Sequence, residues 1–199
     1  TALKLSMATS LVRRALVWAS SRTRPNLARL WRRLGAEMIP ETMHAVQLIG
    51  HGGIDKLAYR TDVPVPQPGA GEVLIRVAAA GVNNTDINTR IGWYSKAITE
   101  DTNTGGAEGF DSVDNDEASW SGTPLTFPRI QGADVCGHVV AVGEGVDPAR
   151  MGERVIVRNM LRTYVDYRPY ECWTIGSECD GGFAQFCVAP SPETHAVNC

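Results

Sequence analysis

Two short segments of this chain gather polar side chains between glycines. Residues 81–86 read Gly-Val-Asn-Asn-Thr-Asp, and residues 132–137 read Gly-Ala-Asp-Val-Cys-Gly. The carboxamides of Asn83 and Asn84 can donate hydrogen bonds to a carbonyl oxygen or accept them from a hydroxyl group. Thr85 adds a hydroxyl group that could pass a proton. These side chains could polarise a carbonyl oxygen by hydrogen bonding, without a metal ion.

Three more side chains extend this candidate set. The phenol of Tyr94 is a further hydrogen-bond donor, and Asp86 and Asp134 are carboxylates that could take part in proton transfer. Structural alternatives remain open for all of these residues. The asparagine pair could satisfy a turn after a strand. Each acid could cap the start of a helix or pair with a basic side chain such as Arg90 or Arg129.

The elements that position these residues are short segments rich in Val, Ile and Ala, which are typical of strands. Strands are expected over residues 45–49, 73–79, 135–142, 154–157 and 183–189. The three prolines at 64, 66 and 68 cannot donate to a central ladder, so residues 59–71 predict an edge strand or an extended connection. Many short strands with little helical periodicity favour a closed or partly closed barrel.

The spacing of the glycines resembles a known signature. Residues 132–146 keep the glycines and the valine of Gly-His-Glu-x-x-Gly-x5-Gly-x-x-Val, the box of zinc-dependent alcohol dehydrogenases. Residues 81–86 are similar to the Gly-Val-Cys-x-Thr/Ser-Asp of that family. Residues 181–186 (Gly-Gly-Phe-Ala-Gln-Phe) are similar to its Gly-Gly-Phe-Ala-Glu-Tyr strand entry. From residue 43 onwards, the chain therefore resembles the N-terminal, GroES-like domain of the medium-chain dehydrogenase/reductase superfamily.

This resemblance implies a mainly β fold, a GroES-like and partly open β-barrel with a few short helices. It places Ala133 where the zinc enzymes have a His ligand and Asn83 where they have a Cys ligand. With both ligands replaced, the chain resembles the zinc-free, quinone-oxidoreductase-like side of the superfamily, and no zinc is expected. The spacing of the soft donors is also unlike that of a four-cysteine zinc lobe. These donors are Cys172, Cys179, Cys187, His195 and Cys199.

The resemblance also implies where the reaction takes place. In the family, the segment matching residues 83–86 lies near the floor of the cleft between the catalytic and nucleotide domains. The family fold also brings the positions of Asp86 and Asp134 near each other, beside the position that the metal ion occupies in the zinc enzymes. The residue types and the resemblance together give six candidate catalytic residues and two cofactor contacts, Asn83 and Thr85. The six are Asn83, Asn84, Thr85, Asp86, Tyr94 and Asp134.

The expected function is zinc-independent hydride transfer from NADPH or NADH to a quinone, enone or carbonyl, and both cofactors stay open. A Gly-rich strand–turn–helix fingerprint for a dinucleotide is missing, and the glycines at residues 50–53 lack a βαβ context. We therefore expect a catalytic-domain fragment that stops before the nucleotide domain and is inactive alone. The alternative is a non-enzymatic truncated barrel, which would be a binding or inert fold.

Charge divides the chain near residue 42. Residues 1–42 carry eight basic and two acidic side chains, a net charge of +6, whereas residues 43–199 carry a net charge of −9. No acid occurs over residues 7–34, where Arg alternates with Leu, Val, Ala, Trp and Ser as in organelle transit peptides. Leu and Trp also recur at helical spacing over residues 27–34. We expect a basic N-terminal extension, disordered or an amphipathic helix, before a domain of residues 43–199.

Residues 97–122 interrupt the strand pattern with seven acids and no Lys or Arg. Such a segment lacks the apolar area that would offset its ordering entropy, so we predict a solvated acidic loop inserted into the domain. Two alternatives stay open: a mobile lid over the active site, and a calcium loop at residues 114–116. The glycine and the distal Glu of a calcium loop are absent.

Composition excludes several other classes. No run approaches the ~18 apolar residues that a membrane span needs, and the Arg-rich arm lacks a nucleic-acid recognition motif. Five cysteines at irregular spacing indicate no disulfide framework, which favours a reducing compartment. We expect a cytoplasmic protein, or a mitochondrial one if the arm is a transit peptide. Its partner would be a small molecule, and members of the family are often homo-oligomers.

Overall fold

The structure of the protein is a computed structural model, which describes residues 39–106, 108–110, 119, 121 and 124–197. The chain divides into two units, Thr1–Met38 and Ile39–Cys199, and the described residues all belong to the second. Most of the predicted N-terminal extension, and the residues of the calcium-loop alternative, therefore lie outside the described residues. Across the described part of the chain, every helix is too short or too polar to cross a membrane.

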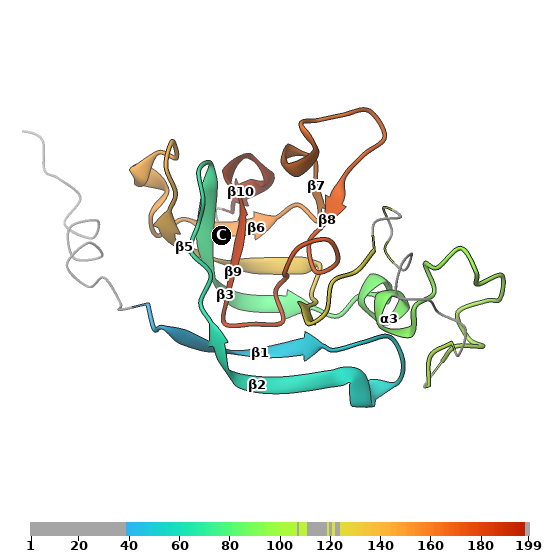
Figure 1. Ribbon diagram of the computed structural model, residues 1–199. Coiled ribbons are helices and arrows are strands. Elements are labelled where there is room, and N and C mark those ends of the chain that lie inside the picture. Colours follow the sequence, from blue (N-terminus) through green and yellow to red (C-terminus); the bar gives the residue numbers. More distant parts are fainter. Residues whose placement is uncertain (1–38, 107, 111–118, 120, 122–123, 198–199) are drawn as a thin grey trace, which may run out of the picture. The chain divides into compact units, whose positions relative to one another are not determined.

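Two larger antiparallel sheets and one two-stranded ribbon contain the named strands of the second unit (Figure 1). The first has the order β2-β1-β4, with β1 at Thr42–Leu48, β2 at Leu57–Pro64 and β4 at Arg129–Ile130. The second has the order β10-β6-β5-β3-β9. Its strands are β3 (Glu72–Gly81), β5 (Asp134–Val142), β6 (Arg154–Val157), β9 (Phe186–Pro190) and β10 (Thr194–Ala196). A separate ribbon pairs β7 (Met160–Leu161) with β8 (Trp173–Thr174).

The chain entering β9 connects the two sheets. The backbone N–H of Val46 donates to the carbonyl of Phe183 at 2.8 Å, and the N–H of Gln185 donates to the carbonyl of His44 at 3.1 Å. Strand β1 therefore runs beside the segment that leads into β9, although the other edges of the sheets stay open. The predicted fold class, a mainly β and partly open barrel, is confirmed.

The predicted strands coincide with observed ones. Strand β6 has the predicted bounds, and the ends of β1, β3, β5 and β9 shift by one to three residues. The proline-rich segment begins in β2, which lies at the edge of its sheet as predicted. Strands β4, β7, β8 and β10 were not predicted, because two or three residues carry too little alternation to identify a strand.

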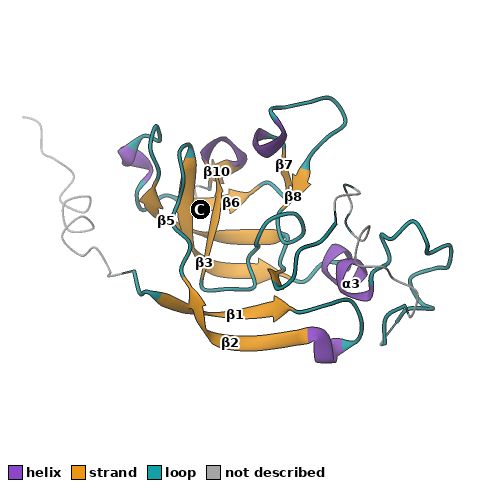
Figure 2. Cartoon of the chain, in the orientation of Figure 1, coloured by secondary structure: helices purple, strands orange, loops and turns teal. Residues whose placement is uncertain are grey.

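Short helices punctuate the strands (Figure 2). The α-helix α3 covers Asn84–Ile91. Four 3-10 helices are η1 (Ile54–Lys56), η2 (Pro148–Arg150), η3 (Thr163–Val165) and η4 (Ser191–Glu193). The turn considered for the asparagine pair is thus the beginning of α3. Gly92 ends this helix in the left-handed conformation, with φ of 80°.

Strand β3 lies between two hydrophobic clusters. Val73 and Ile75 belong to one cluster, whereas Leu74, whose side chain points to the opposite face, belongs to the other. Over residues 73–76, β3 also pairs with β5 on one side and β9 on the other, and Val73, Leu74 and Ile75 are fully buried. The second half of β3, which leads to the site residues, is partly exposed.

The acidic segment is held to the domain at several described points. The indole N–H of Trp93 donates to the carbonyl of Glu100 at 3.1 Å, and the N–H of Phe110 donates to the carbonyl of Ile91 at 3.3 Å. At the far end, the Ser121 hydroxyl donates to the Glu178 carboxylate at 2.8 Å. The described residues of the segment form turns and bends, and solvation of the whole loop stays a prediction.

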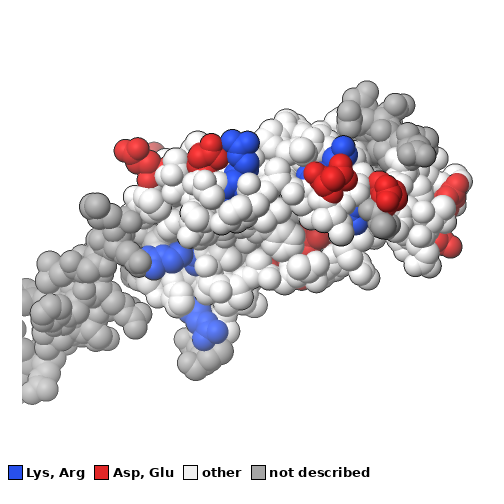
Figure 3. Space-filling view, turned by 90° about the horizontal axis from the view of Figure 1, so that it is seen from below, with Lys and Arg blue, Asp and Glu red and all other residues white. Residues whose placement is uncertain are grey.

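Charge is dispersed on the face of the molecule seen from below. Figure 3 shows a broad surface without Lys, Arg, Asp or Glu, with acidic and basic side chains scattered around it. In the described part of this face, basic side chains do not form a continuous stripe of the kind that binds a nucleic-acid backbone.

Gly137 marks the closest approach of β5 to β3, where it pairs with Val77. A Cβ atom at this position would lie 2.2 Å from the carbonyl oxygen of Arg76 and 2.6 Å from the side chain of Ile75. A backbone atom cannot move aside as a flexible side chain can. Gly137 is therefore required by packing.

We predict that Gly137→Ala lowers the free energy of unfolding by about 2 kcal/mol or more, because the added methyl group overpacks the β3–β5 contact. Urea unfolding measures this change. Gly50→Ala is the matched control, since nothing lies within 4 Å of a Cβ built there. Equal stability of the two variants would show that β3 and β5 are not packed as described.

Candidate active site

Asn83 begins the candidate site by capping α3. Its backbone is extended, its side-chain oxygen accepts from the N–H of Thr85 at 3.4 Å, and its own N–H donates to Asp86 Oδ2 at 2.9 Å. This reciprocal arrangement is a capping box, which satisfies backbone donors that the first turn of a helix leaves without partners. The sequence Asn-x-x-Asp after a strand is what produces it.

The other oxygen of Asp86 reaches the second polar segment. Asp86 Oδ1 accepts from the backbone N–H of Gly132 at 3.0 Å, and the side chain of Gln131 donates to the carbonyl of Asp86 at 2.9 Å. Asp86 and Gln131 are both buried. The start of α3 is therefore fixed to the segment before β5, 46 residues along the chain.

Asn83 also contacts the second carboxylate of the predicted set. Its Nδ2 atom donates to Asp134 Oδ2 at 3.0 Å. Asp134 is exposed at the beginning of β5, and it pairs with Gly81 in the β3–β5 ladder. The carboxamide of Asn83 thus lies between the Asp134 carboxylate and the backbone N–H of Thr85, and these two bonds set its orientation.

Burial raises the pKa of Asp86 above its ordinary value of 3.8. Hydrogen bonds from the backbone N–H groups of Asn83, Gly132 and Ala133 act in the opposite direction, and the nearby charge of Asp134 raises the pKa further. The ionised form of Asp86 is therefore stabilised by backbone dipoles and destabilised by burial and by a second carboxylate.

The remaining predicted residues lie at different distances from this cluster. Asn84 is exposed in the first turn of α3, and Thr85 is half-buried beside it. Tyr94 follows the other end of the helix, where its ring packs edge to face on Trp93 with centroids 5.5 Å apart. Eight helical residues span about 12 Å. The structure thus brings five of the six predicted residues together and leaves Tyr94 apart.

The structural alternatives considered for these residues are also resolved in part. Asp86 does cap a helix start. Arg129 pairs with Asp180 at 2.9 Å, and Asp180 also accepts from the N–H of Ile130. Gln131 was not identified from the sequence, because nothing in its immediate neighbours distinguishes it from an exposed glutamine. The role of the Gly132 N–H had no sequence signal, because it is a backbone group.

The donor set at this position does not fit a zinc ion. Ala133 has no ligand atom, both oxygens of Asp86 accept backbone hydrogen bonds, and Asp134 Oδ2 accepts from Asn83. Throughout the described ranges, no three His, Cys, Asp or Glu side chains come together in a way that could hold a metal ion. The soft donors considered for a zinc lobe do not gather either, and Cys199 lies outside the described residues.

Comparison with known proteins identifies relatives of this domain. The family of alcohol dehydrogenase GroES-like domains matches residues 69–198. Quinone oxidoreductase of Rattus norvegicus is 28% identical over 158 residues, which cover 76% of this chain and 34% of that protein. The chain spans about a third of the length of the curated relatives that it matches.

Solved structures have the same fold. A putative alcohol dehydrogenase from Sinorhizobium meliloti 1021 is 43% identical with a TM-score of 0.65, and the match covers 84% of this chain and 43% of that one. An NAD-dependent alcohol dehydrogenase is 27% identical with a TM-score of 0.57, covering 77% of this chain and 39% of that one.

We predict that Asp86→Ala lowers the free energy of unfolding by about 2 to 4 kcal/mol, because the variant loses a helix cap and leaves the buried Gly132 N–H without its acceptor. Thermal or urea unfolding measures the loss. Asp62→Ala is the control, since Asp62 forms only an exposed pair with Arg60 and its removal should change little. A loss no larger in Asp86→Ala than in this control would contradict the described bonding.

Proposed function

Because this chain belongs to the family of alcohol dehydrogenase GroES-like domains, we propose that it is the catalytic part of an NAD(P)H-dependent oxidoreductase that reduces a small carbonyl, enone or quinone. Relatives named quinone oxidoreductase and alcohol dehydrogenase support the reaction class. The observation that carries the proposal is the carboxamide of Asn83, held in one orientation between Asp134 and the start of α3.

The Asn83 amide nitrogen has two N–H groups. Among the described contacts, Asp134 accepts one of them. We propose that the second N–H, with the carboxamide of the exposed Asn84, holds the substrate's carbonyl oxygen. Hydrogen-bond donors that are fixed before the reaction stabilise charge on such an oxygen without the cost of reorienting. Orienting Asn83 is the role proposed for the neighbouring Asp134 carboxylate.

Reduction of a carbonyl adds a hydride to the carbon and a proton to the oxygen. We propose that the half-buried hydroxyl of Thr85 passes this proton, and that the exposed Asp134 connects the site to solvent. Asp86 is proposed to position the site without contacting the substrate, because both of its carboxylate oxygens accept hydrogen bonds from backbone N–H groups. Tyr94, at the far end of α3, is proposed to contact a part of the substrate remote from the reacting oxygen.

The nicotinamide cofactor, when bound, supplies the hydride. All named strand pairs in the described ranges are antiparallel, so these residues contain no βαβ unit that could hold a pyrophosphate at a helix N-terminus. The described residues therefore do not fit a whole dinucleotide. Asn83 and Thr85 are proposed only as contacts to its reacting end, and both NADP and NAD stay in the proposal.

Zinc independence is part of the proposal, supported by the poor fit of the donor set. A cytoplasmic location, with the mitochondrion as the alternative, is proposed as well. Four cysteines, Cys136, Cys172, Cys179 and Cys187, are free thiols, which suits a reducing compartment. We propose a homo-oligomer only because members of the family are often homo-oligomers.

We predict that the purified chain contains far less than one zinc per molecule after chelator treatment, because Ala133 and Asn83 replace two ligands. Elemental analysis measures the content. A sample incubated with zinc chloride and then exchanged into metal-free buffer serves as the control for weak surface binding. About one zinc per chain, retained through the exchange, would refute zinc independence.

We predict that the chain alone does not oxidise NADPH or NADH, and that fusing residues 43–197 to the remainder of the Sinorhizobium meliloti relative gives activity, because hydride transfer needs both reactants held at close range. In the fusion, Asn83→Ser should lower kcat by about 10- to 1000-fold. Serine still caps α3, so a capping defect alone would not explain the loss.

Tyr94→Phe should raise KM more than it lowers kcat, because its proposed contact is remote from the reacting oxygen. Gln67→Ala, in the exposed segment after β2, is the control that should behave like the parent. Oxidation by the isolated chain would contradict the first expectation. Unchanged kcat in Asn83→Ser would remove Asn83 from the mechanism.

A further inference from the structure

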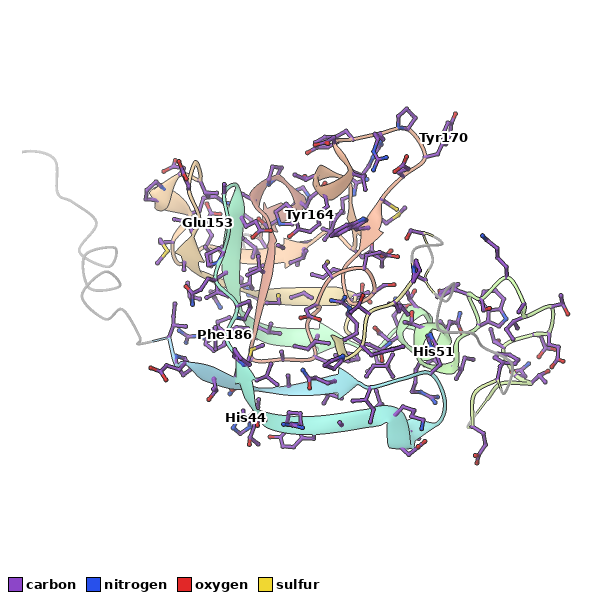
Figure 4. All side chains as sticks on the ribbon, in the orientation of Figure 1. His44, His51, Glu153, Tyr164, Tyr170 and Phe186 are labelled. Carbon is purple, nitrogen blue, oxygen red and sulfur yellow. The ribbon has the colours of Figure 1, made fainter. Side chains whose placement is uncertain are left out.

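The loop at residues 50–53, which follows β1, packs against the second half of α3 through reciprocal bonds. The N–H of Gly52 donates to the carbonyl of Arg90 at 2.9 Å, and the Arg90 guanidinium donates to the carbonyl of Gly52. His51 lies in this loop, and Figure 4 shows it beside α3. The loop therefore supports the helix from the end opposite to Asn83.

The contacts of His51 fix which ring nitrogen carries the hydrogen in the neutral form. Its Nδ1 atom lies 2.8 Å from the carbonyl oxygen of Thr89. Because a carbonyl oxygen only accepts, Nδ1 must carry the hydrogen. The Nε2 atom is buried and has no hydrogen-bond partner among the described residues. Phe127 covers the ring edge to face, with centroids 5.0 Å apart. A neutral ring whose Nε2 atom carries no hydrogen fits this site.

Protonation would place a hydrogen and a positive charge on that buried Nε2 atom. Burial lowers the pKa of His51 below 6.5, although its hydrogen bonds to the backbone of Thr89 and Arg90 act in the opposite direction. On α3 itself, the buried side chain of Arg90 donates to the carbonyl of Gly52 in the same loop.

The other elements around the ring offer no compensating bond in the described structure. In η1, Asp55 pairs with Lys56 at 3.3 Å. Glu108, whose backbone approaches Gly52, is exposed. Two residues after Phe127, Arg129 pairs with Asp180. A hydrogen on Nε2 of a charged ring would therefore find no acceptor among the described residues.

We propose that neutral His51 is a positioning residue that holds the 50–53 loop on α3, and that protonation of its ring releases this contact and loosens the helix. Asn83 and Asp86 lie at the other end of the same helix. Mild acid would therefore disturb the candidate site by loosening the helix that positions these two residues. The inference goes beyond the proposed function and does not depend on it, because it is tested on the order of the helix rather than on turnover.

The sign of the effect follows from linkage. In the unfolded chain His51 titrates near 6.5, whereas the folded chain takes up this proton only at lower pH. The contribution of His51 to stability is therefore complete above pH 6.5 and is lost as the pH falls through the folded pKa.

Amide hydrogen exchange on the full chain tests this at pH 7.5 and pH 5.5. The readouts are the amides of Gly52, which bonds to Arg90, and of Gly92, which bonds to Thr89. After correction for intrinsic exchange rates, their protection should fall by at least about threefold at the lower pH. In His51→Asn, whose amide can replace Nδ1 as donor but cannot be protonated, the change should stay below about twofold. His138→Asn, on an exposed position of β5, should behave like the parent.

Nitrogen NMR of the parent protein's histidine rings gives a second readout that needs no variant of His51. The expected result is an Nδ1–H tautomer for His51 whose ring takes up a proton only below the ordinary histidine pKa of 6.5. Equal pH dependence in the parent and in His51→Asn would overturn the proposal. A His51 ring that titrates at the ordinary histidine pKa of 6.5, with the protection of Gly52 unchanged, would overturn it as well.

Discussion

The geometry of the candidate site depends on one buried carboxylate. Asp86 accepts from the N–H of Asn83 with one oxygen and from the N–H of Gly132 with the other. The first bond fixes where α3 begins, and the second fixes the helix to the segment that enters β5. Because Asp134 is the second residue after Gly132, its contact with Asn83 follows from the same anchor. A buried charge is costly, and two charge-assisted backbone bonds are what offset that cost here.

The strands behind the site supply a rigid frame for this anchor. The first half of β3 lies between β5 and β9 with its side chains buried on both faces, and α3 begins three residues after β3 ends. At the start of β3, the hydroxyl of Tyr164 donates to the Glu72 carboxylate at 2.5 Å, and Glu72 also accepts from the N–H of Gly69 at 2.7 Å. Burial and the Glu72 charge raise the pKa of Tyr164, so its hydroxyl stays a donor at neutral pH. Both ends of β3 are thus fixed by carboxylates.

A similar arrangement secures the last described strands. The Arg150 guanidinium donates to Ser191, to the carbonyl of Thr194 and to Glu153, while the buried Glu193 accepts from the backbone of Arg162. These bonds hold η4 and β10 against η2 and η3. Polar side chains therefore connect the short elements of this barrel, because elements of two or three residues bury too little apolar area to hold their own positions.

Much of the fold could be read from the sequence, because Val- and Ile-rich segments between glycines and prolines identify the longer strands directly. Gly137 and the GroES-like resemblance pointed to the right packing. The helix α3 was missed as a helix, since its buried face consists of Asp86, Thr89, Arg90 and Ile91, and only the last of these is apolar. Its stability comes from caps and tertiary hydrogen bonds, which sequence periodicity does not report.

The candidate site could be read only in part for a related reason. Residue types and glycine spacing selected Asn83 to Asp86 and Asp134, which the fold does bring together. Tyr94 is close in sequence to that group, yet a helix of about 12 Å separates it. Gln131 and the N–H of Gly132 complete the network through contacts that span more than forty residues. Such pairings depend on strand register, and no local pattern encodes them.

The most direct test of this account is an NMR measurement of the backbone N–H of Gly132 over a range of pH. If Asp86 accepts from it in a buried position, this amide is strongly protected from exchange. Its proton shift then changes with the titration of Asp86, at a pKa above the ordinary value of 3.8. An amide at Gly132 that exchanges as freely as an exposed one, with a shift indifferent to pH, would contradict the anchor on which the site depends.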